Sequence, residues 1–259
     1  MKKRKKLTKK QQTMIWIALA VVIFLLAGLL IFSGISKKQK NKVMAAGDTA
    51  IDNTMFSYFF WTEVNYRYAE GSGQVGPNFD LTLDVQMYDE STTWEEYLIG
   101  EIVPMVEYEM AMVKAAEAEG FEMPREIQTQ CDGVLENFRQ NSQDMQYDSL
   151  NDYLADTYGE GADEKSFARY LYYDFMAVAY NDELYQRTEP TEEQVLDYYE
   201  RWLPNYEEGD LAAAREDLHR EEYYNAVEKV QAEHPIEIWE ENIVIAKPHG
   251  AHVQTGEEH

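Results

Sequence analysis

Apolar residues follow three patterns along the chain. Residues 14–35 form an unbroken apolar run of 22 residues without a charge. Between residues 53 and 233, apolar positions recur every three or four residues, which is the period of a helix that buries one face. Residues 43–51 and 236–246 contain β-branched residues in partial alternation, which is typical of short strands. We therefore predict a mainly α-helical domain with a small β element, formed by pairing of its N- and C-terminal ends, after one transmembrane helix.

Capping and breaking residues predict where the helices begin and end. Thr92 and Thr93 lie three residues before Glu95 and Glu96, which is the spacing of a capping box, so we expect a helix over residues 94–119. Pro104 should kink this helix, and Gly120 supplies a left-handed residue to end it. Pro124 suits the first turn of the next helix.

The other helices are predicted in the same way. Asn53 or Thr54 can cap the first helix, and Ser149 a short one. Another helix begins near Asp163, and Thr191 is in capping-box register with Gln194 for a helix that ends near residue 203. A charged helix covers residues 211–233, and Gly47-Asp48 is a hairpin turn signal between the two short strands before residue 53.

The apolar run of residues 14–35 is long enough to span a membrane. Seven cations precede it and four follow it, which predicts a cytoplasmic N-terminus and an extracytoplasmic body. The run is longer than the apolar core of a signal peptide, so we expect an uncleaved signal anchor rather than a cleaved leader. No cysteine follows closely for lipid attachment. The expected location is the cell membrane, with a single pass.

These boundaries divide the chain into six parts. They are a basic cytoplasmic segment (1–13), the anchor (14–35), a polar tether (36–42), a helical domain (43–206), a closing helix and strand that return to that domain (207–246), and a disordered tail (247–259).

Charge separates the N-terminal segment from the body. Residues 1–42 carry ten Lys, one Arg and no acid, so of the net charge of −25 the remaining residues carry −25 − 11 = −36. An acidic body repels nucleic acid, whose binding requires cations. Neutral or basic partners are expected instead. An equally good explanation is that the acidic surface only keeps the protein soluble. The only cysteine, Cys131, cannot form an intramolecular disulfide, and we interpret it as structural.

The order of these elements resembles the N-terminal chaperone region of the SurA and PrsA family. The matching stretches are VMAAGDTAID, then TMFSYFFWTEV, then VEYEMAMVKAAEAEGFEMPREI, and the proline-led EPTEEQVLDYYERW. The resemblance covers residues 43–206 and, more faintly, 211–245. It implies a helical domain that binds unfolded or secreted polypeptides.

One departure from the family concerns catalysis. In its foldases, the helix like EPTEEQVLDYYERW leads into a parvulin-type prolyl isomerase domain. Here Tyr206 is followed by EEGD and the helix from Leu211, which leaves no room for a domain of about 100 residues. The parvulin domain is therefore expected to be absent, and we assign no catalytic residue.

Other chemistry finds little support. The five histidines lie in the tail or beside a charged helix, and His249, His252 and His259 are an unconvincing metal set. No calcium loop, phosphate-binding loop or nucleophile elbow occurs. We expect no metal and no cofactor.

Tyrosine and methionine are abundant, with 19 Tyr and 11 Met. Both residue types suit surfaces that accept many sequences. In the helix around 167–185, the stripes of Tyr170, Tyr173, Ala177, Tyr180 and Leu184 and of Phe167, Leu171, Phe175 and Val178 are expected in the core. The candidate client-binding residues are Tyr172 and Met176 on the opposite line, and Tyr58, Trp61, Tyr66 and Tyr68, which cannot all face one core.

Three functions remain open. The first is a membrane-anchored extracytoplasmic chaperone that holds client polypeptides on an aromatic and Met-lined surface. The second is a non-catalytic scaffold subunit of a cell-envelope complex, with one fixed partner. The third is a peptidyl-prolyl isomerase of the same family.

Overall fold

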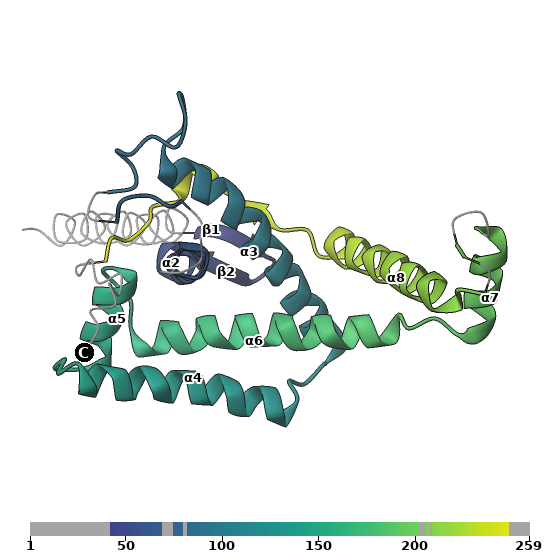
Figure 1. Cartoon of the computed structure of the whole chain (residues 1–259). Coiled ribbons are helices and arrows are strands. Elements are labelled where there is room, and N and C mark those ends of the chain that lie inside the picture. Colours follow the sequence, from purple (N-terminus) through teal and green to yellow (C-terminus); the bar gives the residue numbers. More distant parts are fainter. Residues whose placement is uncertain (1–41, 69–74, 80–81, 203–205, 208, 249–259) are drawn as a thin grey trace, which may run out of the picture. The chain divides into compact units, whose positions relative to one another are not determined.

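The computed structural model describes residues 42–68, 75–79, 82–202, 206–207 and 209–248. Over these residues the chain is mainly helical, with seven α-helices and a small sheet (Figure 1). The helices are α2 (Asn53–Tyr68), α3 (Trp94–Glu119), α4 (Arg125–Asp144), α5 (Leu150–Tyr158), α6 (Glu164–Arg187), α7 (Glu192–Arg201) and α8 (Leu211–Glu233). The described residues from Val43 onward belong to one compact unit.

The ends of this unit meet in the sheet, as the sequence predicts. Strands β1 (Lys42–Ala46) and β2 (Thr49–Asp52) form a hairpin around Gly47, whose φ is +56°. Strand β3 (Glu237–Ile238) pairs antiparallel with β1, with Met44 opposite Ile238, and the strand order is β2-β1-β3. The expected strand over 236–246 is shorter than predicted, because the chain turns into a 3₁₀ helix at Glu240–Asn242.

Caps define the helix ends. Thr93 forms the predicted capping box with Glu96, Gly120 ends α3 at φ +68°, and Thr191 caps α7 with Gln194. The expected cap of α2 at Asn53 or Thr54 is wrong: Asp52 accepts the bond from the Met55 N–H at 3.0 Å. Pro124 is the N-cap of α4 rather than part of its first turn.

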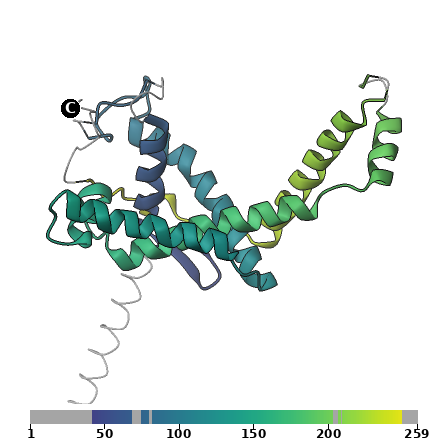
Figure 2. The same cartoon turned by 60° about the horizontal axis from the view of Figure 1, so that its bottom comes forward.

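The core lies where α2, α3 and α6 pack together, and α4 lies beside α6 (Figure 1). Its largest fully buried side chains come mainly from α2 and α3 and include Tyr58, Phe56, Phe60, Leu98 and Met110. Helix α8 packs on α3 and α6, and α7 packs on α8 (Figure 2). Val195, Ala214 and Leu218 form a separate small cluster between α7 and α8.

Candidate functional site

Helix α6 is the central element of the unit, because α2, α3, α4, α5 and α8 all pack against it. One of its faces stays uncovered. Tyr172, Val178 and Tyr185 are 39%, 50% and 48% exposed, and Phe175 is half-buried among them. At 100° per residue these four positions fall on one side of the helix. We call Tyr172, Phe175, Val178 and Tyr185 the aromatic stripe.

Ring contacts extend the aromatic stripe onto α8. The ring centroid of Tyr185 lies 5.4 Å from that of Tyr223, with the planes at 71°, and 4.0 Å from the ring of His219. Tyr223 in turn lies 5.7 Å from Tyr224, which is 57% exposed. Apolar and amphipathic surface therefore continues from α6 across its junction with α8.

A polar network fixes the same junction from the inside. The hydroxyls of Tyr108 in α3 and Tyr223 in α8 both donate to Oδ1 of Asn181 in α6. The two hydroxyl oxygens are 3.3 Å apart. Burial, followed by the hydrogen bond to Tyr223, raises the pKa of Tyr108 well above its ordinary value, so this hydroxyl stays protonated. The three helices are thus held in register beneath the exposed rings.

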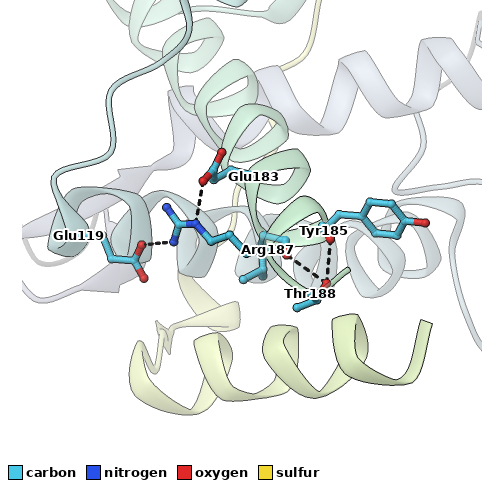
Figure 3. Close-up of polar contacts among 6 residues, drawn as sticks. Glu119, Glu183, Tyr185, Arg187 and Thr188 are labelled. Atoms are coloured by element: carbon cyan, nitrogen blue, oxygen red, sulfur yellow. Dashed lines mark hydrogen bonds and ion pairs between the residues drawn. The ribbon is translucent and has the colours of Figure 1, made fainter. Parts of the chain in front are cut away.

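Charged groups at the end of α6 lie apart from the aromatic stripe. Arg187 donates to Glu119 of α3 at 2.5 Å and to Glu183 at 2.7 Å (Figure 3). The Tyr185 ring points away from this pair, while its backbone carbonyl accepts from Thr188 Oγ1 at 2.9 Å. The ion pairs therefore hold the C-terminal turn of α6 on α3 without involving the Tyr185 ring, which packs against α8 instead.

The structure separates the candidate residues of α6. Tyr172 is exposed as expected, but the expected exposure of Met176 is wrong, because its side chain is only 3% exposed. A helical projection assumes one buried face, whereas several helices surround α6 and bury Met176 on a second face. For the same reason Val178, expected in the core, lies instead on the uncovered face.

The four candidate residues on α2 also differ in their exposure. Tyr66 is 80% exposed and Tyr68 is half-buried, whereas Tyr58 and Trp61 are buried. This confirms that they do not all face one core. Tyr58 cannot belong to a preformed exposed patch, since its hydroxyl is bound to Ser166 and its ring lies among other buried rings.

A second exposed apolar group was not predicted. Val85, Met87 and Tyr88 are 67%, 54% and 44% exposed in the segment before α3. Tyr88 stacks on Tyr97 with a centroid distance of 3.9 Å and an interplanar angle of 7°. The sequence signal for it is the apolar residues of LTLDVQMY, which carry no clear helical period.

Two carboxyl groups lie between α3 and α6. Oε2 of Glu109 is fully buried and has no hydrogen-bond partner among the described residues. Burial and then the charges of Asp174 and Glu63 raise the pKa of Glu109 to about 8. Burial also raises the pKa of Asp174. The Cys131 thiol is buried, and this raises its pKa too, which makes it a poor nucleophile.

The described part of the chain contains no group of three or more His, Cys, Asp or Glu side chains that could hold a metal ion. His249, His252 and His259 lie outside the described residues, as does the expected anchor at 14–35. Among the helices that the structure does describe, none has the length and apolar character needed to cross a membrane.

Comparison with known proteins returned no matching family model, no matching curated protein and no matching solved structure.

Proposed function

We propose that this protein is a membrane-anchored extracytoplasmic chaperone that holds unfolded or secreted polypeptides without a prolyl isomerase site of its own. The observation that carries the proposal is the aromatic stripe, in which Tyr172, Val178 and Tyr185 are each at least 39% exposed along one face of the central helix. Exposed apolar side chains that gather on one face are typical of a surface to which another chain binds.

The side-chain types on this surface suit clients of many sequences. Tyrosine offers a large apolar ring with a polar end, so it contacts apolar chains and still tolerates water. The rings lie on helices that are held together by the hydrogen bonds of Tyr108 and Tyr223 to Asn181. This fixed arrangement limits the conformational entropy that is lost when a client binds.

The surrounding charge suits clients that are themselves basic. The chain carries −36 after residue 42, and an acidic surface attracts basic segments while it keeps the complex soluble. The expected anchor at residues 14–35 would hold the domain close to the membrane, where secreted chains emerge.

The test is suppression of aggregation of a chemically unfolded protein by the body of the chain. A pulldown that returns one fixed partner, with no suppression, would favour the scaffold function instead. Acceleration of cis–trans exchange in a proline peptide would favour the isomerase.

A further inference from the structure

An extended segment near the C-terminal end of the described chain lies across α2. We call residues 242–247 the strap. It begins at the last residue of the 3₁₀ helix, and Ile243 and Ile245 alternate with the exposed Val244. Ile245 is 5% exposed and belongs to the main core cluster, whereas Val244 is 65% exposed. One side of the strap is therefore buried and the other faces solvent, as in a strand laid on a surface.

Side chains of α2, rather than a neighbouring strand, form hydrogen bonds with the main chain of the strap. Asn53 Nδ2 donates to the carbonyl of Asn242 at 3.0 Å, and Asn53 Oδ1 accepts from the Val244 N–H at 2.8 Å. One turn later, Ser57 Oγ accepts from the Ala246 N–H at 3.1 Å. Within the described chain, residues 244–248 make no hydrogen bond between backbone groups.

The next turn of α2 completes the pattern. Trp61 Nε1 donates to the carbonyl of Ala246 at 2.8 Å. Asn53, Ser57 and Trp61 are spaced at i, i+4 and i+8, so they form one line along the helix, which we call the polar row. All four bonds go to main-chain atoms of the strap. The polar row therefore recognises an extended backbone and not a particular sequence.

We infer that the polar row of α2 is a binding site for an extended polypeptide, which the strap occupies and which a client segment can take in its place. This inference rests on the proposed holding function and names a second site for it. Holding a client requires contacts that any sequence can make, and main-chain groups are the only ones that all clients share.

The strap also indicates which client segments fit. The residue at the place of Ile245 should be apolar, because that side chain is buried. The residue at the place of Ala246 should be small: Gly159, at the end of α5, comes so close that a Cβ added to it would lie 2.5 Å from the Ala246 Cβ. The next residue should be basic, since Lys247 pairs with Asp84 at 3.2 Å.

Beside the strap, the surface has room for a guest chain to approach. An open depression of about 370 Å³ is lined by Asn53, Thr54, Glu160, Val244, Ala246 and Lys247. It touches the start of the polar row and one edge of the strap. A client could therefore contact Asn53 before the strap has fully left.

The experiment uses the full chain in detergent micelles and a fluorescent peptide, ENIVIAKP, which copies residues 241–248. Binding is followed by anisotropy. Ile245→Asp should detach the strap, because it places a charge in the core. Val244→Asp is the matched control, since it adds the same charge one residue away on the exposed side.

Affinity for the peptide depends on the fraction of molecules whose site is open. We expect Ile245→Asp to bind the peptide at least about tenfold more tightly than the original chain, and Val244→Asp to bind it like the original chain. A second peptide with proline at the places of Val244 and Ala246 lacks both N–H donors and should bind at least about tenfold more weakly. Adding Asn53→Ala to Ile245→Asp should weaken binding of the first peptide similarly.

The inference is overturned if folded Ile245→Asp binds no better than Val244→Asp, or if the proline peptide binds equally well. Should Ile245→Asp not fold, hydrogen exchange on the original chain decides instead. The amides of Val244 and Ala246 should exchange faster than those of β1, and the peptide should alter their rate; exchange only through global unfolding would refute a site that opens. If the chain suppresses aggregation but does not bind the peptide, the proposed holding function stands and rests on the aromatic stripe alone.

Discussion

The hydroxyl of Tyr58 lies 2.8 Å from Oγ of Ser166, and this contact joins α2 to the first turn of α6. The same hydroxyl accepts from the Asp163 N–H at 3.0 Å, so it takes part in the cap of α6. Replacing Tyr58 by Phe keeps the ring and removes the oxygen. We expect a loss of about 1–3 kcal/mol in the free energy of unfolding, measured by denaturant titration.

Tyr66→Phe is the control for that substitution, since Tyr66 is 80% exposed on the same helix. Its effect should stay within about 0.5 kcal/mol. Equal losses for the two variants would mean that the buried hydroxyl contributes nothing particular to the fold.

The raised pKa of Glu109 makes stability depend on pH. In the folded chain this carboxyl keeps its proton up to about pH 8, while in the unfolded chain it loses it near its ordinary value of 4.5. The folded state therefore binds the proton more tightly, so the stability that Glu109 adds is complete below about pH 4.5 and is lost as the pH rises through about 8. The raised pKa of Asp174 acts in the same direction.

We expect the Tm to fall between pH 5 and pH 8, and to fall less in Glu109→Gln, which stays neutral throughout. Glu126→Gln, on the exposed side of α4, should follow the original chain. A parallel pH profile for Glu109→Gln and the original chain would contradict the assignment of this dependence to Glu109.

Gly159 combines a close approach with an unusual backbone. Its φ is +98°, and an added Cβ would lie within 2.6 Å of the Ala246 backbone carbon. Gly120 is the control for a positive φ without a close neighbour, because its φ is +68° and an added Cβ would meet nothing within 4 Å. Gly120→Ala should cost about 1–2 kcal/mol through the backbone alone. Gly159→Ala should cost at least about 1 kcal/mol more, because its ψ of 172° lies in a region that essentially only glycine adopts and because the strap must also move. Equal costs in thermal unfolding would show that the strap does not press on Gly159.

Local signals predicted the helices better than they predicted the packing. Thr93, Gly120 and Thr191 act within one turn of their own position, so their caps could be read directly from the sequence. The meeting of β1 with β3 was also predicted, because both ends carry strand-forming residues. The strand over 236–246 was too long, since side chains of α2 take over the bonds that a partner strand would supply.

The binding surface was predicted only in part. Tyr172 was placed correctly on the surface, although Met176, which shares its line on the helix, is buried. Met176 was expected to be exposed but is buried, and Val178 was expected to be buried but is exposed. The periodicity of one helix does not tell how many neighbouring helices surround it. The polar row was not predicted as a set, although Trp61 was one of the candidate client-binding residues. Asn53, Ser57 and Trp61 share no residue type, and only the strap, nearly 190 residues away, shows that they act together.

The aromatic stripe should contribute to holding clients without contributing to stability. Tyr172→Ala with Tyr185→Ala removes two exposed rings, so we expect the Tm to change little and aggregation suppression to weaken severalfold. Met176→Ala gives the opposite pattern: it should cost about 2–5 kcal/mol of stability and leave suppression intact below its unfolding temperature. If suppression is unaffected by the loss of both tyrosines, the aromatic stripe does not hold clients.

The most direct measurement of the proposed function uses residues 43–259, whose described part belongs to one compact unit with a main core cluster of its own. A cooperative thermal transition first verifies that this fragment is folded. It is then titrated into a chemically unfolded, aggregation-prone protein while light scattering is followed. The account predicts suppression near stoichiometric amounts, reduced in Tyr172→Ala with Tyr185→Ala. Scattering that is unchanged by an excess of folded fragment would contradict it.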